Sequence, residues 1–511
     1  MKSFLRRYGS RIQGVLHGFD RLRFRGTLRA LSFVRGMSGF LFATGVPFRD
    51  FDKYAQKSTE QIRHATYEFA KANGRPLKPF SSRDKEADAL AVAQRDGITS
   101  GLIGVFSATE SCLSYEVRGN GRTKKLDLCK RPRKCLHYYH YYLHPTFGLL
   151  HVRLQTWFPF GIHVCLNGRE WLARQLDAEG IPYQQRDNCL VQIGDLDRAQ
   201  QLADAQVSTA WPTVLDQLAR QANPVHDTLF ALRPMDYYWS VEQSEWASDV
   251  LFRDPADLGR LYPQLVHHAI EHLSCADVLR FLGRKEAGHS EIHASKKTRR
   301  EGIRVKHWIN GNSIKMYDKQ AQILRVETTL NQVDDYRAYR TKEGDEGGAK
   351  SWRPMRKGVA DLARRAEVSQ AGNNRYFETL ATVDETTSLA ELTTRVCRPV
   401  QRQGQRARAL NPLADKDAAL LTAVYHGEFA ANGFRNRDLR PLLFGDKPVS
   451  TDTQRRQAAA VTRQLRLLRA HGLIQKLQGT HRYNVTVQGR TIITALLAAR
   501  KADTCKLTDA A

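Results

Sequence analysis

The chain has 511 residues, 41% of them hydrophobic, and its 79 Lys and Arg against 53 Asp and Glu give a formal net charge of +26. No apolar run approaches the roughly 20 residues that cross a bilayer, and no apolar segment of a secretory signal follows the basic N-terminus. Eight scattered cysteines argue against a disulfide framework and predict a reducing cytoplasm. We expect several domains and a nucleic-acid partner rather than a membrane.

Residues 1–193 predict strands and helices without a regular βαβ order, which favours an α+β sheet region. The stretch "HGFDRLRFRGTLRAL" has the alternating charges of a strand, with Asp20 near its start. The other predicted elements, in chain order, are helices over 48–74 and 82–96, strands over 101–107 and 112–119 joined by a turn at Thr109 and Glu110, a hairpin over 147–167 that turns at Phe158-Pro159, and a helix capped by Asn167.

The run "CKRPRKCLHYYHYYLH" over 129–144 combines cations, aromatics and potential zinc ligands. Its Cys-x5-Cys-x-His spacing differs from that of the usual zinc sites and does not favour zinc. One interpretation is a nucleic-acid surface, in which the cations meet phosphates and the tyrosines stack on bases. The alternative is a tyrosine-rich core helix with a solvated basic entrance. The residues concerned are Arg131, Arg133, Lys134, Tyr138, Tyr139, Tyr141 and Tyr142.

Residues 194–300 predict a mainly helical insertion, and over 302–330 the hydrophobic period returns to two. In this second stretch Lys315, Tyr317 and Lys319 fall on one face of a strand. Arg325 and Glu327 share a face of the next strand, so pairing would bring the two groups together. A carboxylate flanked by cations stays ionised, which suits either a metal ligand or a cross-strand ion pair.

This hairpin resembles a motif of the rolling-circle replication initiators of plasmids and filamentous phages, in which Tyr-x-Lys precedes Arg-x-Glu. Tyr317, Lys319, Arg325 and Glu327 stand at the matching positions. The resemblance implies a palm-like antiparallel sheet, a carboxylate that helps to bind a divalent cation, and a tyrosine that attacks a DNA phosphate. A covalent mechanism would use Tyr317, a tyrosine of "DDYRAYR", which holds Tyr336 and Tyr339, or a tyrosine of the run over 129–144.

Asp20, Glu116 and Glu327 are the carboxylates on predicted strands that could share a metal, and we expect Asp20 and Glu327 to hold a Mg²⁺ or Mn²⁺ ion. The residues expected in the catalytic site are Asp20, Tyr317, Lys319 and Glu327, and those expected to contact nucleic acid beside them are Lys315 and Arg325.

Two further basic stretches follow. "SWRPMRKGVADLARRAEVSQ" predicts a phosphate-contacting loop with Arg353, Arg356 and Lys357, the alternative being a solvated helix face. "VCRPVQRQGQRARALNP" over 396–412 has no acid and no periodicity, and we interpret it as a linker. An exposed loop inside one domain is the alternative.

Residues 413–511 predict two helices, a long third helix over 451–471, two short strands and a last helix. This order resembles the winged helix of MarR-type regulators, which implies a helix-turn-helix that reads DNA. The cations expected to contact nucleic acid are Arg455, Arg456, Arg463 and Arg466 on the third helix, and Lys476 and Arg482 in the wing.

The chain is therefore predicted to be an α+β protein, with a palm-like antiparallel sheet, a helical insertion and a C-terminal winged helix. The expected boundaries are 1–193, 194–300, 301–395, 396–412 and 413–511. The expected function is nucleic-acid binding in a mobile genetic element, replication-initiator-like or transposition-like, with metal-dependent cleavage. The alternative is a non-catalytic DNA-binding regulator or an RNA-binding ribonucleoprotein component, with DNA favoured over RNA.

Overall fold

The computed structural model describes most of the chain. The described residues are 1–186, 188–271, 293–299, 302–309, 311–319, 321–342, 347–381, 389–402, 404–425, 433–445, 450–477 and 480–501, with the single positions 273, 277, 281, 282, 345 and 429. Within them, no helix has the length and apolarity that crossing a bilayer requires.

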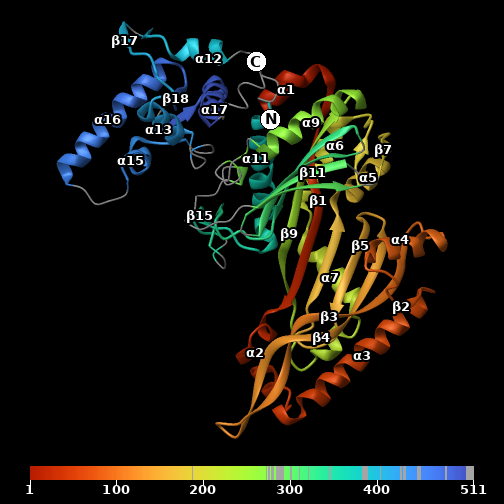
Figure 1. The fold of residues 1–511 in the computed structure, drawn as a ribbon. Coiled ribbons are helices and arrows are strands. Elements are labelled where there is room, and N and C mark those ends of the chain that lie inside the picture. The colour runs from red at the N-terminus through yellow and green to blue at the C-terminus, as the bar shows by residue number, and fades with distance from the viewer. Residues whose placement is uncertain are drawn as a thin grey trace. The chain divides into compact units, whose positions relative to one another are not determined.

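The fold is α+β, with one large mixed sheet (Figure 1). The sheet is not purely antiparallel as predicted, because β2 runs parallel to β3. The strand order is β10-β11-β12-β13-β9-β1-β6-β5-β4-β3-β2. The bounds are β1 Ile12–Leu28, β2 Leu77–Pro79, β3 Gly101–Asn120, β4 Lys125–His144, β5 Gly148–Gln155, β6 Ile162–Asn167, β9 Tyr237–Phe252, β10 His293–Arg299, β11 Gly302–Ile309, β12 Asn312–Lys319 and β13 Ile323–Leu330.

The chain forms two compact units, and both are discontinuous in sequence, unlike the five consecutive regions expected. The first unit comprises Met1–Gln13, Val250–Thr328 and Val368–Ala511, and the second comprises Gly14–Asp249 and Thr329–Glu367. The predicted helical insertion over 194–300 includes the 16-residue strand β9, whose length the sequence did not reveal. The reason is that β9 lacks a clean alternation, since its last seven residues are all buried.

In the second unit, most local predictions are confirmed. The predicted helices correspond to α3 (Phe51–Ala72), α4 (Lys85–Arg95) and α5 (Gly168–Ala178), and the predicted hairpin is β5–β6 with a cis Phe158-Pro159 bond. The other helices of this unit are α2 (Val34–Ala43), α6 (Leu196–Ala205), α7 (Trp211–Ala222) and α8 (His226–Leu229). Two short strands, β7 (Gln184–Gln185) and β8 (Leu190–Val191), pair with each other.

The turn predicted at Thr109 and Glu110 is wrong, because both residues lie inside β3, which runs unbroken over 20 residues. Its partner β4 pairs with it through this point, with Thr109 opposite Leu136 and Glu110 opposite Cys135. The hydrogen bonds between β3 and β4 therefore keep this stretch extended, although its local sequence favours a turn.

The tyrosine run lies in the strand β4 rather than in a helix or on an open surface. Tyr138, Tyr139, Tyr141 and Tyr142 are all buried, so the predicted stacking of these rings on bases is wrong. Successive residues of a strand point to opposite faces. Tyr139 and Tyr141 pack with α4, while Phe69 of α3 contacts His140 on the other face. Helices on both faces thus bury the whole run.

The first unit contains α1 (Lys2–Tyr8), α9 (Pro255–Glu271) and most of α11 (Leu362–Leu380), and ends in a C-terminal module. The module's elements are α12 (Leu389–Val396), β16 (Val400–Arg402), β17 (Gln405–Ala407), α13 (Asp415–Val424), α15 (Asn436–Phe444), α16 (Thr451–Ala470), β18 (Ile474–Lys476), β19 (Tyr483–Val485) and α17 (Val487–Lys501). One apolar core joins them, with Leu420, Phe434, Val461, Leu468 and Ile493 at its centre.

The stretch predicted as a linker is ordered within this module. Strands β16 and β17 form a hairpin, in which Gln401 lies opposite Arg406. Val396 and Leu410, on either side of the hairpin, are buried in the apolar core. The tertiary packing of these two apolar residues holds a stretch that has no local periodicity.

Candidate nucleic-acid interface

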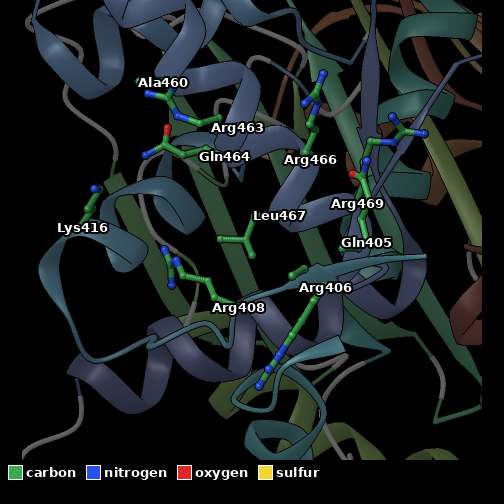
Figure 2. A pocket seen from close by; sticks show the side chains of 12 residues that line it. Gln405, Arg406, Arg408, Lys416, Ala460, Arg463, Gln464, Arg466, Leu467 and Arg469 are labelled. Carbon is green, nitrogen blue, oxygen red and sulfur yellow. The ribbon is translucent and has the colours of Figure 1, made fainter. Parts of the chain in front are cut away.

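The C-terminal module contains a basic pocket of about 530 Å³, between α16, the hairpin β16–β17 and the start of α13 (Figure 2). The cations that line it are Arg406, Arg408, Lys416, Arg463, Arg466 and Arg469. Among the described residues, no carboxylate belongs to the lining. A concave surface lined by six cations and no acid favours a polyanion, because its positive potential attracts negative charge from solution.

Helix α16 presents three of these cations because of how its sequence divides between two faces. The Ser450 hydroxyl caps the helix by accepting a hydrogen bond from the backbone N–H of Thr453 at 3.4 Å. Val461, Leu465 and Leu468 are buried in the core. Arg463 and Arg466 consequently point away from the core and are exposed. The helix is therefore divided into an apolar stripe and a basic face.

Arg408 has an acidic partner. Its guanidinium donates to the carboxylate of Asp417, with 2.6 Å and 2.8 Å between the atoms, and this hydrogen bonding lowers the pKa of Asp417. His471 contacts the backbone oxygen of Arg408 at 2.8 Å. Arg408 therefore holds the wall of the pocket in place, whereas the exposed arginines of α16 are oriented toward solvent.

The remaining predicted contacts of this module lie outside the pocket lining. Arg455 and Arg456 are exposed on the N-terminal half of α16, with Arg455 3.8 Å from Asp452. Lys476 is exposed on β18, and Arg482 donates to the backbone oxygen of Gly433 at 3.2 Å. Sequence reasoning did not single out four of the cations that line the pocket, Arg406, Arg408, Lys416 and Arg469. For Arg406 and Arg408 the signal was the run of arginines without an acid over 396–412, which was interpreted as a linker.

In the first unit, the predicted cluster around Glu327 is formed. The Tyr317 hydroxyl donates to Glu327 Oε2 at 2.7 Å, and the Lys315 ammonium pairs with Oε1 of the same carboxylate. The Arg325 guanidinium lies 5.9 Å from the centre of the Tyr317 ring. Glu327 and Arg325 are fully buried, and Lys319 is buried nearby in sequence. The cross-strand ion pair, one of the two alternatives for this carboxylate, is therefore present.

Asp20 lies on β1 in the second unit and is buried. Its carboxylate accepts a hydrogen bond from the Asn188 amide at 2.8 Å. Because Asp20 and Glu327 belong to different units, their sharing of a divalent cation stays a prediction.

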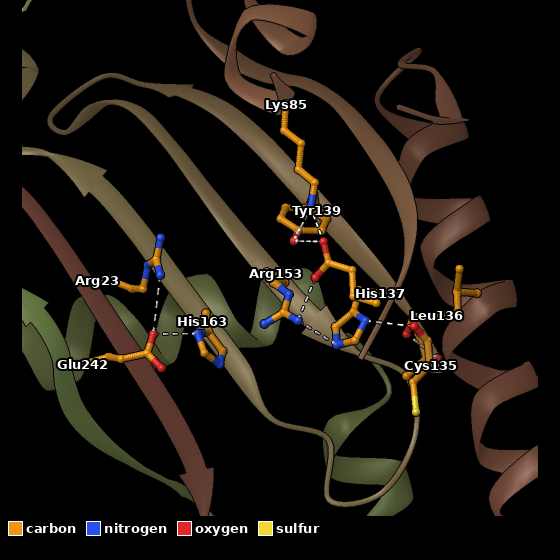
Figure 3. A network of polar contacts seen from close by, with 11 residues as sticks. Arg23, Lys85, Cys135, Leu136, His137, Tyr139, Arg153, His163 and Glu242 are labelled. Atoms are coloured by element: carbon orange, nitrogen blue, oxygen red, sulfur yellow. Dashed lines mark hydrogen bonds and ion pairs between the residues drawn. The ribbon is translucent and has the colours of Figure 1, made fainter. Parts of the chain in front are cut away.

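The second unit contains a polar network on one face of its strands (Figure 3). Lys85 donates to the Tyr139 hydroxyl at 2.8 Å, and Tyr139 donates to Glu110 Oε1 at 2.8 Å. Arg153 lies 2.8 Å from the other oxygen of Glu110 and 3.1 Å from His137 Nε2. Burial opposes ionisation of Glu110, but the hydrogen bonds from Lys85 and Tyr139 and the charge of Arg153 outweigh it and lower its pKa to about 2. Glu110 is therefore ionised at neutral pH, where it holds its cationic partners and does not act as a proton donor.

The three cations of the run over 129–144 that were predicted to contact nucleic acid differ in their surroundings. Arg131 and Arg133 on β4 each lie 3.9 Å from Glu116 on β3, while Lys134 is exposed. The predicted phosphate-contacting loop with Arg353, Arg356 and Lys357 does not belong to this network. Arg353 is half-buried on the strand β15 (Ser351–Pro354), and Arg356 and Lys357 after it are exposed.

Comparison of the chain with protein-family models, with curated proteins and with solved structures finds no match.

Proposed function

We propose that this chain binds nucleic acid through its C-terminal module, with α16 and the hairpin β16–β17 contacting the phosphate backbone. The observation that carries this proposal is the pocket lined by six cations and no carboxylate among the described residues. Arginine forks bind phosphate oxygens by two hydrogen bonds at once, and each neutralised phosphate releases a counterion. The net charge of +26 adds a long-range attraction in the same direction.

The order of elements supports a winged helix as the binding module. Helices α13, α15 and α16 precede the two-stranded β18–β19 and the last helix α17. In a winged helix, the third helix enters the major groove and the strands form a wing at its side. The Asn436 side chain ties α15 to α16 by donating to the backbone oxygen of Ala458 at 2.8 Å, which fixes the angle between the second and third helices. DNA is therefore the favoured nucleic acid.

The test is binding of a labelled short DNA duplex, measured by fluorescence anisotropy over a range of salt concentrations. Arg463→Glu/Arg466→Glu is expected to weaken binding by about tenfold or more and to reduce the slope of log K against log salt by about two. The matched control is Arg49→Glu, which reverses an exposed arginine of the second unit beside Asp50. Equal affinity and equal salt slope for the double variant and the wild type would contradict the proposal.

Phosphodiester cleavage is a second candidate function, because Tyr317 and Glu327 have the arrangement of a nucleophile and its base. The phenol donates to the carboxylate at 2.7 Å, and Lys315 orients that carboxylate in turn. Such a chain of three side chains is the usual way in which an enzyme activates a hydroxyl. This candidate retains the expected relation to replication initiators.

A further inference from the structure

A pair of exposed aromatic rings lies in the second unit, on a small hairpin. Trp352 is 55% exposed and Tyr339 is 58% exposed. The other six tryptophans all lie within the described residues and are buried or half-buried. Large aromatic rings are usually removed from water, so two neighbouring exposed rings mark an interaction surface.

The two rings face the same side of a small hairpin. Strand β14 (Arg337–Arg340) pairs antiparallel with β15, and Tyr339 stands directly opposite Trp352. Their ring centres are 5.6 Å apart, with 52° between the planes. The Arg364 guanidinium lies 5.3 Å from the centre of the Trp352 ring. The two rings and the guanidinium therefore form one cluster on the hairpin, in which the rings are tilted against each other.

The hairpin is held rigidly from behind. On its other face Ala338 is buried, as is Met355, whose backbone N–H donates to the Tyr336 oxygen at 2.8 Å. The Arg340 guanidinium lies 3.1 Å from the buried carboxylate of Asp361. Arg364 donates from Nε to the backbone oxygen of Arg337 at 2.9 Å. The two exposed rings are therefore presented on a fixed support, which lowers the entropy lost on binding.

The charges around the rings favour a phosphate-bearing partner. Side chains alternate along a strand, so Arg337 falls on the face of Tyr339, while Lys350 directly precedes β15. Both cations are exposed. Arg356 and Lys357, the predicted phosphate contacts, follow β15 and are exposed as well. Rings that stack on bases, with cations beside them for phosphates, are the two parts of a single-strand binding site.

We propose that Tyr339 and Trp352 form a platform on which unpaired bases of a single-stranded nucleic acid stack, while the neighbouring cations contact its phosphates. Bases inside a duplex are already stacked on each other, so the platform selects unpaired strands. The proposal deepens the proposed function and rests on it for the class of ligand. It adds a second site in another unit, with a different preference from that of α16.

The test uses the full-length protein and fluorescein-labelled oligo(dT) and oligo(rU), with a short DNA duplex in parallel. Trp352→Ala is expected to weaken binding of the single strands by about fivefold or more and to leave duplex binding unchanged. Trp352→Phe keeps a ring and is expected to retain most of the affinity. It should nevertheless remove most of the quenching of tryptophan fluorescence that oligo(dT) causes in the wild type.

The matched control is Phe42→Ala, which removes another exposed ring of the second unit, 89% exposed on α2. Loss of single-strand binding in Trp352→Ala with duplex binding intact supports the platform, even if the α16 double variant shows no defect. Unchanged single-strand binding in Trp352→Ala and Tyr339→Ala would overturn it, whatever the α16 variant does. Binding of a proline-rich peptide that depends on Trp352, without binding of either oligonucleotide, would also overturn it.

Discussion

Arg153 on β5 and Glu110 on β3 form an ion pair of 2.8 Å between Nη2 and Oε2, although the strand β4 lies between them. Tyr139 of β4 donates to the same carboxylate, so three strands of the second unit meet at one side chain. The half-buried carboxylate remains ionised because its partners outweigh the cost of burial.

Replacing this carboxylate is expected to destabilise the protein. Glu110→Gln keeps the shape but leaves Arg153 and Lys85 without their anion, so the free energy of unfolding should fall by about 1–2 kcal/mol. Urea unfolding at neutral pH, followed by circular dichroism, measures this change. Glu60→Gln removes an exposed partner of Arg63 and serves as the control, with an expected change within about 0.5 kcal/mol. Equal losses in the two variants would contradict the assigned role.

The stability of the protein should fall between pH 6.5 and pH 4 because of His137. Burial, followed by the charge of Arg153, lowers the pKa of His137 to about 4. Since Arg153 donates to Nε2, the ring proton sits on Nδ1 and donates to the Cys135 oxygen at 3.0 Å. In the unfolded chain the ring takes a proton near pH 6.5. Below that pH the unfolded state binds more protons, so stability is full above pH 6.5 and is lost as the pH falls toward 4.

His137→Gln is expected to reduce the slope of unfolding free energy against pH in this window by up to about one proton. Denaturant titrations at several pH values measure the slope. His64→Gln, at an exposed histidine of α3, should leave the slope unchanged. A slope in His137→Gln as steep as that of the wild type would disprove the contribution of this ring.

Substitutions of two arginines of the basic pocket should have different effects, one on stability and the other on nucleic-acid binding. Arg408 is paired with the buried carboxylate of Asp417, so Arg408→Gln is expected to lower Tm by a few degrees. Arg463 is exposed, so Arg463→Gln should weaken nucleic-acid binding by about two- to tenfold and leave Tm unchanged. Differential scanning calorimetry and anisotropy on the same samples measure both properties. An identical profile for the two variants would contradict the different roles assigned to them.

The cleavage candidate predicts that Tyr317 and Glu327 act together. If the wild type nicks supercoiled or single-stranded DNA with Mg²⁺ or Mn²⁺, both Tyr317→Phe and Glu327→Gln should lose at least about a hundredfold in rate. Tyr376→Phe removes the hydroxyl of another buried tyrosine of the first unit and should retain activity. Absence of nicking by the wild type on every substrate, with tight binding kept, would remove this candidate.

The local pattern of residues was sufficient for several elements and for the main charged features. Helices α3 and α4, the hairpin β5–β6 and the strands over 302–330 follow from hydrophobic periodicity and from turn residues. The pairing of Lys315 and Tyr317 with Glu327 follows from the two-residue period of strands. The basic face of α16 follows in the same way from the period of a helix.

The tertiary structure alone decided which of these faces are covered and which remain open. The tyrosines of β4 are buried because α3 and α4 cover opposite faces of the strand, and both helices are distant from it in sequence. Arg406 and Arg408 line a pocket because a hairpin folds against α16. Tyr339 is exposed while Tyr336 is buried. Periodicity is a property of neighbouring residues, whereas burial depends on segments brought together from far along the chain. The sequence therefore determined several of the elements and their charges, whereas long-range packing determined the remaining strands and which charges and rings are exposed.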